Sequence, residues 1–315
     1  MDQKILKNDF LQIEYRTDSL RVTGLTPTGK TNLLADLSDL APISTSYGDF
    51  HFHGGHRLWH APESMPRTYM PDKGELKISE LANGVLLEAS TEPGTGIRKR
   101  IKIQLAPDAA SVILTHSLIN DGLWTVELAP WAITQFRLGG TVILPVPVGS
   151  ADPHGLLPNR RFSFWPYARI NDPRLKLDDN FVLFHATARL PPFKFGYFSV
   201  HGWTAYWLEG ILFRKTIQVH RDLLHPDDNC NAEMYCNDQF VELESLAPLT
   251  KLADNKEGPG VKQKLPKDKI LYFHCKSGGR CRIAADLLKK DGFDIRPLKP
   301  GYQELIEAGF KKAKE

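Results

Sequence analysis

The most distinctive stretch of the sequence is Gly54-Gly55-His56-Arg57-Leu58-Trp59-His60-Ala61-Pro62-Glu63, which is followed by Arg67-Thr68-Tyr69-Met70-Pro71-Asp72. It lies within a region, residues 1–253, whose pattern is typical of an all-β fold. Short alternating or continuous apolar runs recur there, bounded by Gly, Pro, Asn and Asp. No long amphipathic helix interrupts them, so the pattern predicts a large antiparallel sandwich or barrel.

The predicted strands in this region are 11–15, 84–89, 100–105, 111–119, 125–129, 141–145, 181–186, 204–208, 212–217 and 240–243. Large aromatic side chains are spread among them and can fill a core or line a cleft. The tryptophans are Trp59, Trp124, Trp131, Trp165, Trp203 and Trp207.

The overall composition is that of an ordinary soluble globular protein, with 315 residues of which 42% are hydrophobic and 24% charged. A net charge of +3 is too small to suggest nucleic acid or an anionic membrane as a partner. No apolar stretch reaches the ~18 residues of a membrane span, and the N-terminus lacks an apolar signal core. The four cysteines form no C-x-x-C pair, so reduced thiols and a cytoplasmic location are expected.

Three later stretches complete a family resemblance: residues 130–135 (PWAITQ), 193–197 (FKFGY) and 240–246 (FVELESL). Together with the first stretch they resemble the galactose mutarotase-like proteins, in a branch allied to the aldose 1-epimerases. The resemblance covers nearly all of residues 5–253. It implies a large antiparallel β-supersandwich with a sugar-binding site.

The resemblance also implies an acid–base pair. In such epimerases a His protonates the ring oxygen and a Glu removes the proton of the anomeric hydroxyl. Glu244 matches the position of the base, whereas Gln135 stands where the acid is expected and cannot donate a proton in that role. Glu242 lies on the same strand face as Glu244, and repulsion between the two would raise one pKa toward neutrality. A salt bridge at a strand end is the alternative role for Glu244.

The predicted sugar-pocket residues are His53, His56, Arg57, Trp59, Glu63, Gln135, Lys194, Glu242 and Glu244. The histidines at 51, 53, 56 and 60 allow three interpretations: pocket lining, ordinary hydrogen-bonded side chains, or a metal site through the His-x-His spacing. Gly54-Gly55 interrupts the strand between them, and we assign no metal and no cofactor.

A different motif lies near the C-terminus, where an apolar run at 270–273 precedes His274-Cys275-Lys276-Ser277-Gly278-Gly279-Arg280. A helical pattern follows, with apolar residues on one face and Gly292 placed as a stop. A strand, a tight loop and a helix would aim backbone N–H groups at Cys275. The helix N-terminus, Lys276 and Arg280 would favour its thiolate, and the glycines allow the loop to form an anion nest.

This loop resembles the active loop of the rhodanese-type sulfurtransferases, which runs six residues from Cys to Arg, as Cys275 to Arg280 does. The resemblance covers residues 265–315, the C-terminal half of such a domain. It implies that Cys275, with Arg280, takes sulfur as a persulfide from a small donor such as thiosulfate or another persulfide. Lys276, Ser277, Gly278 and Gly279 would bind the anion. A Cys-dependent phosphatase, whose loop has one more residue, and a buried structural Cys are the alternatives.

The sequence therefore predicts a β-supersandwich over 1–253, a polar Gly/Pro-rich linker over 254–265 and a partial rhodanese-like α/β piece over 266–315. The expected function is weak sulfur transfer through a Cys275 persulfide. The alternative is a carbohydrate-binding or aldose epimerase-like protein, with a sugar or sugar phosphate as partner and the C-terminal piece as a passenger.

Overall fold

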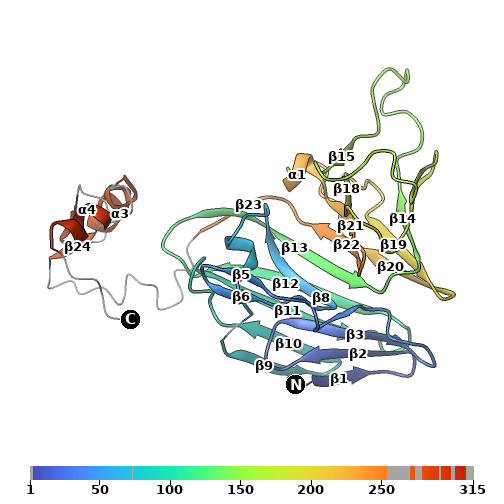
Figure 1. The fold of residues 1–315 in the computed structure, drawn as a ribbon, viewed down its shortest axis with the longest axis horizontal. Helices are drawn as coiled ribbons and strands as arrows, with labels where there is room; N and C mark the ends of the chain where they lie inside the picture. Colours follow the sequence, from blue (N-terminus) through green and yellow to red (C-terminus); the bar gives the residue numbers. More distant parts are fainter. Residues whose placement is uncertain are drawn as a thin grey trace. The chain divides into compact units, whose positions relative to one another are not determined.

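The computed structural model describes residues 3–72, 74–253, 270–273, 279–290, 292–298 and 302–309. The chain divides into two compact units, Met1–Asp254 and Asn255–Glu315 (Figure 1). Within the described ranges, no helix has both the length and the apolar character needed to cross a membrane.

The first unit is built on a ten-stranded antiparallel sheet (Figure 1). Strands distant in sequence lie side by side in it, so its centre joins the first, middle and last parts of the unit. Its order is β1 (Gln3–Lys7), β2 (Leu11–Arg16), β3 (Arg21–Pro27), β8 (His56–Ala61), β13 (Val126–Phe136), β22 (Val241–Leu246), β21 (Ala232–Cys236), β18 (Phe193–Tyr197) and β15 (Phe162–Phe164), with β23 (Thr250–Leu252) also paired to β13.

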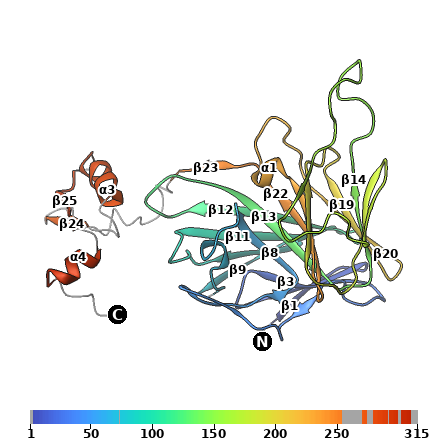
Figure 2. The same cartoon turned by 45° about the horizontal axis from the view of Figure 1, so that its top comes forward.

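Two smaller antiparallel sheets accompany the large one (Figure 2). The first has the order β12 (Val112–Asn120), β11 (Ile97–Leu105), β10 (Gly84–Ala89) and β9 (Leu76–Leu81). The second has the order β16 (Leu175–Leu177), β17 (Phe181–His185), β14 (Thr141–Pro145), β19 (Trp203–Leu208) and β20 (Ile211–Thr216). Short elements complete the unit: the pairs β4 (Asp36–Leu37) with β7 (His53–Gly54) and β5 (Ile43–Thr45) with β6 (Gly48–Phe50), η1 (Arg67–Tyr69) and α1 (Pro226–Asn229).

The main apolar core joins one face of the large sheet to both smaller sheets. Leu58 of β8 and Leu243 of β22 contribute from the large sheet, Ile101 from the first small sheet and Val142 and Phe184 from the second. Since strand side chains alternate between faces, the residues next to Leu58 and Leu243 in sequence point to the other face. That other face carries the charged residues described below.

All ten predicted strand runs coincide with strands of the structure, namely β2, β10, β11, β12, β13, β14, β17, β19, β20 and β22. The prediction for β13 was too short, because the strand continues past Pro130 to Phe136 with Trp131, Ile133 and Gln135 on one face. The distinctive stretch itself forms β8, every residue of which is buried.

The glycine pair before β8 is required by its backbone and its surroundings. Gly54 and Gly55 have φ values of 78° and 71°, which side chains rarely tolerate. A Cβ on Gly55 would lie 2.0 Å from the carbonyl oxygen of Val22, and one on Gly54 would lie 2.0 Å from that of Ala35. This kink sets the register in which β8 enters the sheet.

Replacement of Gly55 by Ala is therefore expected to destabilise the protein by about 3 kcal/mol or more, because strain and a backbone clash add together. Gly29→Ala is the matched control, since Gly29 has φ 73° but no atom within 4 Å of an added Cβ. The control should cost only about 1 kcal/mol. Urea unfolding measures both, and equal losses would show that the close approach at Gly55 contributes nothing.

The second unit contains β24 (Leu271–Phe273) paired in parallel with β25 (Ile295–Pro297), α3 (Gly279–Lys290) and α4 (Tyr302–Glu307). Ala285, Leu288, Phe293 and Ile295 form its buried cluster. Gly292, with φ 85°, follows α3 as the sequence predicts. β24 lies within the predicted apolar run at 270–273 and α3 is the helix predicted after it, whereas a rhodanese domain is not shown.

Candidate functional site

The register of three central strands gathers the polar residues on one face of the large sheet. Ile133 of β13 lies opposite Arg57 of β8 on one side and Glu244 of β22 on the other. Gln135, two residues along β13, lies opposite Glu242. Side chains of directly opposed residues share a face, so these four polar groups come together. We call this surface, completed by Lys194 and Glu233, the polar face.

Glu242 accepts two hydrogen bonds on the polar face. Arg57 Nη2 lies 3.1 Å and Gln135 Nε2 2.9 Å from its Oε1 atom. Burial raises the pKa of Glu242 to about 7; the Arg57 guanidinium opposes this rise and Glu244 adds to it. Burial, rather than the expected repulsion between the two glutamates, is thus the main cause of a pKa suited to a base near neutrality.

A second cluster on the polar face consists of one ammonium group between two carboxylates. Lys194 Nζ lies 2.9 Å from Glu233 Oε2 and 3.0 Å from Glu244 Oε2. Glu233 and Glu244 are directly opposed across β21 and β22, and both are fully buried. The indole Nε1 of Trp131 donates a further hydrogen bond of 2.8 Å to Glu244. Lys194 also lies against the rings of Trp131 and Trp165, at 4.8 and 4.5 Å.

The protonation of this cluster follows from its charges. Burial alone would lower the pKa of Lys194, but the carboxylates of Glu244 and Glu233 outweigh burial and raise it well above its usual value. Burial, with the Glu244 charge, raises the pKa of Glu233 well above its usual value against the opposing Lys194 charge. Lys194 is therefore held as an ammonium ion, whereas ionisation of Glu233 is disfavoured.

Several polar atoms on this face have no partner. Among the described residues, no hydrogen-bond partner exists for Arg57 Nε and Nη1, Gln135 Oε1 or Glu244 Oε1, although all four atoms are buried. A buried polar atom without a partner costs about 1–3 kcal/mol. Such atoms in a native protein are explained by a ligand, water molecule or ion that forms the missing hydrogen bond.

Aromatic and acidic side chains form the rim of the polar face. Tyr69 packs on Trp59 with ring centroids 4.9 Å apart, and its hydroxyl donates a hydrogen bond to the exposed Glu63. Tyr167, which is 40% exposed, lies 6.5 Å from the ring of Tyr235. Burial raises the pKa of Tyr167, and the charges of Lys194 and Glu244 also act on it. Tyr69 and Tyr167 therefore pack on Trp59 and Tyr235, aromatic residues of the same sheet.

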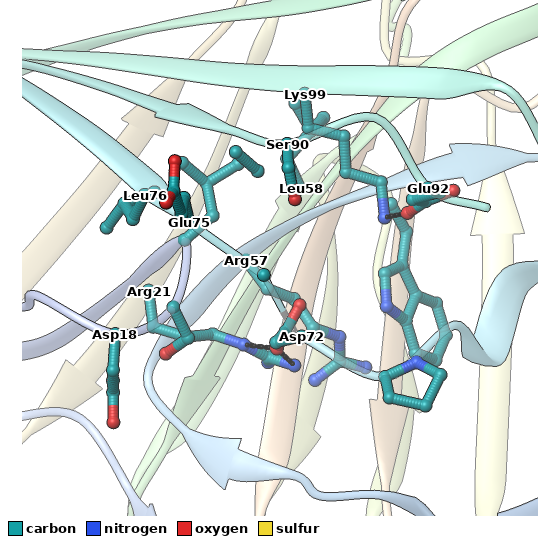
Figure 3. A pocket seen from close by; sticks show the side chains of 16 residues that line it. Asp18, Arg21, Arg57, Leu58, Asp72, Glu75, Leu76, Ser90, Glu92 and Lys99 are labelled. Atoms are coloured by element: carbon teal, nitrogen blue, oxygen red, sulfur yellow. Dashed lines mark hydrogen bonds and ion pairs between the residues drawn. The ribbon is translucent and has the colours of Figure 1, made fainter. Parts of the chain in front are cut away.

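Arg57 also borders a small cavity of about 30 Å³ (Figure 3). Arg21, whose guanidinium pairs with Asp72 at 2.6 Å, lies on one side of it, and the ion pair of Lys99 with Glu92 lies on the other. A space of this size holds one water molecule.

The four histidines at positions 51, 53, 56 and 60 diverge. His56 points to the face opposite Arg57, where it contacts His116, and His60 Nε2 lies 3.4 Å from Glu92. The rings of His51 and His53 stack on each other at 5.7 Å. The described ranges contain no group of three or more His, Cys, Asp or Glu side chains able to hold a metal ion.

Six of the nine predicted sugar-pocket residues meet on the polar face: Arg57, Trp59, Gln135, Lys194, Glu242 and Glu244. Glu63 reaches its rim through Tyr69. His56 cannot line the same pocket as Arg57, because adjacent residues of β8 face opposite ways. His53 precedes the Gly54-Gly55 kink and pairs with Leu37 in a separate small sheet.

Sequence reasoning missed Trp131, Glu233 and Tyr69. Side chains of β13 alternate between faces, so Trp131, four residues before Gln135, lies on the same face. The sequence pattern could therefore have identified it. Glu233 gives no such signal, because its position depends on the pairing of β21 with β22. Cys275, Lys276, Ser277 and Gly278 lie outside the described residues, and Gly279 and Arg280 begin α3.

The fold of the large unit recurs in a solved structure, a galactose mutarotase-like protein from Lactobacillus casei ATCC 334. The two share 10% sequence identity with a TM-score of 0.54, over 81% of this chain and 96% of that one. The large unit has a galactose mutarotase-like fold. At this identity the likeness concerns the fold alone.

Two further solved structures are also similar at lower scores. The Slr1438 protein from Synechocystis sp. PCC 6803 has 11% identity and a TM-score of 0.48, over 80% of this chain and 91% of that one. A galactose mutarotase related enzyme from Lactobacillus acidophilus has 9% identity and a TM-score of 0.42, over 82% and 89%. No family model and no curated protein matches the sequence.

Loss of the shared ammonium should be strongly destabilising. Lys194→Met leaves Glu233 and Glu244 facing each other without a cation, and is expected to cost about 3 kcal/mol near pH 8. In the variant no cation opposes the negative charge of the carboxyl pair, so folding would require this pair to take up a proton that it does not need beside Lys194. That uptake costs nothing below the carboxyl pKa of the unfolded chain and more as pH rises above it, so the loss should be smaller at pH 5. Urea unfolding at both pH values tests this.

Two variants serve as controls for this prediction. Lys77→Met makes the same substitution at an exposed site on β9 and should change stability little at either pH. Glu233→Gln closely mimics the protonated carboxyl group and should cost within about 1 kcal/mol. A Lys194→Met loss that did not depend on pH would contradict the charge assignment.

Proposed function

We propose that the large unit binds an aldose or an aldose phosphate on the polar face. The observation that carries this proposal is the set of buried atoms without partners: donors on Arg57, and acceptors on Gln135 and Glu244. Sugar hydroxyl groups both donate and accept hydrogen bonds, so one ring can satisfy both kinds of atom. Trp59 and Trp131 supply apolar surface beside them, as small-molecule sites generally do.

The fold supports this proposal over sulfur transfer. A galactose mutarotase-like fold agrees with the carbohydrate-binding or epimerase-like alternative. Sulfur transfer through Cys275, with thiosulfate or a persulfide as donor, gains no support from the comparisons. Because the cluster is buried, entry of a sugar requires Tyr69 or Tyr167 at the rim to move aside.

Isothermal titration calorimetry with aldohexoses and their 6-phosphates should find a ligand, and Glu244→Gln should weaken its binding about tenfold or more. The reason is that a hydrogen bond to a charged group contributes about 1.5–3 kcal/mol. Glu127→Gln, an exposed change on the same sheet, is the matched control and should leave the affinity unchanged. Absence of binding by the whole panel, or equal binding by the Glu244 variant, would refute the proposal.

A second candidate function is proton transfer at the anomeric carbon. It is favoured by the pairing of Glu233, whose raised pKa favours its protonated form, with Glu244 on the neighbouring strand. Two carboxyl groups whose environments differ can serve as acid and base. Glu233 would then supply the proton that Gln135 cannot.

Polarimetry of freshly dissolved α-anomers tests this second function. Weak catalysis of anomer exchange is expected for the unmodified protein, and Glu233→Gln should reduce it about 100-fold while sugar binding is retained. Exchange that survives in Glu233→Gln would exclude Glu233 as the acid. Binding without any exchange would leave sugar binding as the function of the face.

A further inference from the structure

A larger cavity, of about 380 Å³, lies on the other face of the ten-stranded sheet. Its floor includes His56 of β8 and Thr134 of β13, and its walls are β12 and β20. Each wall is the edge strand of one of the smaller sheets. We call this cavity the edge groove.

The lining of the edge groove is mainly apolar, and all its ionisable groups are basic. His56, His116, Arg214 and Lys215 line it, whereas no Asp or Glu does so among the described residues. The apolar lining comes from the floor and both walls: Leu11, Ile13, Val22, Leu25, Leu33, Leu34, Val112, Leu114, Ile211 and Phe213.

A chain of hydrogen bonds runs along the floor of the edge groove. Lys215 Nζ donates to the backbone oxygens of Ala132 and Leu243, at 2.8 and 3.0 Å, and to Thr134 Oγ1 at 3.3 Å. Thr134 Oγ1 lies 2.9 Å from His56 Nδ1, and His56 Nε2 lies 2.8 Å from His116 Nε2. His56 is 3% exposed.

The charge of Lys215 decides which atoms donate and which accept in this series of hydrogen bonds. A protonated Lys215, which is the form that pairs with an anion, can only donate, so the hydroxyl hydrogen of Thr134 then has His56 Nδ1 as its acceptor. His56 must then carry its proton on Nε2 and donate it to His116 Nε2. The hydrogen of His116 therefore sits on Nδ1, which has no hydrogen-bond partner within the described part of the chain.

Three of the four basic groups of the edge groove, Lys215, His116 and His56, have pKa values below their usual ranges. Burial lowers the pKa of Lys215 to about 7, against opposing effects of Glu244 and Glu242 on the far side of the sheet. Burial and the Lys215 charge lower the pKa of His116 to about 3, and burial lowers that of His56 further below its usual range. An anion bound beside these groups would raise their pKa values and so favour their charged forms, which donate hydrogen bonds to it.

We propose that the edge groove is a binding site for a small monocarboxylic acid with an apolar body. The apolar part would lie along Val112, Leu114, Ile211 and Phe213 between the two edge strands. The carboxylate would accept hydrogen bonds from Lys215 Nζ and His116 Nδ1. It would replace the long 3.3 Å bond from Lys215 to Thr134, while the two shorter bonds to backbone oxygens stay.

The charge balance favours an acid over other apolar molecules. A carboxylate supplies the negative charge that the lining lacks, and burial makes a charge-assisted hydrogen bond stronger. An amine would meet only basic groups, and an alcohol would gain the apolar contacts without the ion pair. The proposal is independent of sugar binding, which concerns the opposite face.

Titration calorimetry of the full chain with octanoate and with 1-octanol tests this site. Octanoate should bind at least about tenfold more tightly than octanol. At pH 8 the free Lys215 amine is mostly uncharged, and a bound carboxylate raises its pKa, so binding should take up a proton. Heats measured in phosphate and in Tris, whose ionisation enthalpies differ, detect that proton.

Three variants locate the site. Lys215→Met should weaken octanoate binding about tenfold and abolish proton uptake, while octanol binding stays within about twofold. Ser111→Trp, at the exposed mouth of the groove, should weaken both ligands. Lys77→Met, on an exposed strand, should change neither. Thermal unfolding by circular dichroism verifies that each variant is folded.

The proposal is overturned if octanoate and octanol bind equally, or if Lys215→Met leaves octanoate binding and proton uptake unchanged. It is also overturned if neither ligand binds but a capped peptide of alternating valine and threonine does. The open edges of β12 and β20 would in that case be a site for strand addition.

Discussion

The ammonium group of Lys194 has to neutralise two carboxyl groups that no water reaches. Glu233 and Glu244 are both fully buried and directly opposed on neighbouring strands, and removing charges from water costs several kcal/mol for each ion. One cation lies between them, and the raised pKa of Glu233 disfavours a negative charge on it. The polar face thus holds two buried carboxyl groups with a cation within 3.0 Å of both.

Strand β13 connects the polar face to the edge groove. Trp131, Ile133 and Gln135 point to the polar face, whereas Ala132 and Thr134 line the groove. A shift of one residue in its register would exchange the two sets and bury Gln135 in the apolar core. The Gly54-Gly55 kink, which fixes how neighbouring β8 enters the sheet, therefore supports both surfaces.

The local pattern of the sequence predicted strands and their faces, but not their neighbours. Alternation alone indicated that Glu242 and Glu244 share a face, and the ten predicted runs were confirmed as strands. Glu233 could not be found in this way, since β21 and β22 meet only through tertiary pairing. The misplacement of His56 had the same origin: its motif suggested a pocket, but its position in β8 turns it away from Arg57. The likeness to mutarotases guided both the fold and the candidate residues, whereas Cys275 to Gly278 of the sulfurtransferase motif lie outside the described residues.

Lys194 and Lys215 show how the surroundings of a buried amine decide what a face of the sheet can bind. Lys194 contacts β22 on the polar face and Lys215 contacts it on the face of the edge groove. The pKa of Lys194 is nevertheless raised, whereas that of Lys215 is lowered. Lys194 has two carboxyl groups within 3.0 Å, whereas Lys215 has only backbone oxygens and a hydroxyl group in contact. The first amine is paired with carboxyl groups of the protein, so its face offers hydrogen bonds to hydroxyl-rich molecules. The second gains a counter-ion only from outside, so its groove suits an acid.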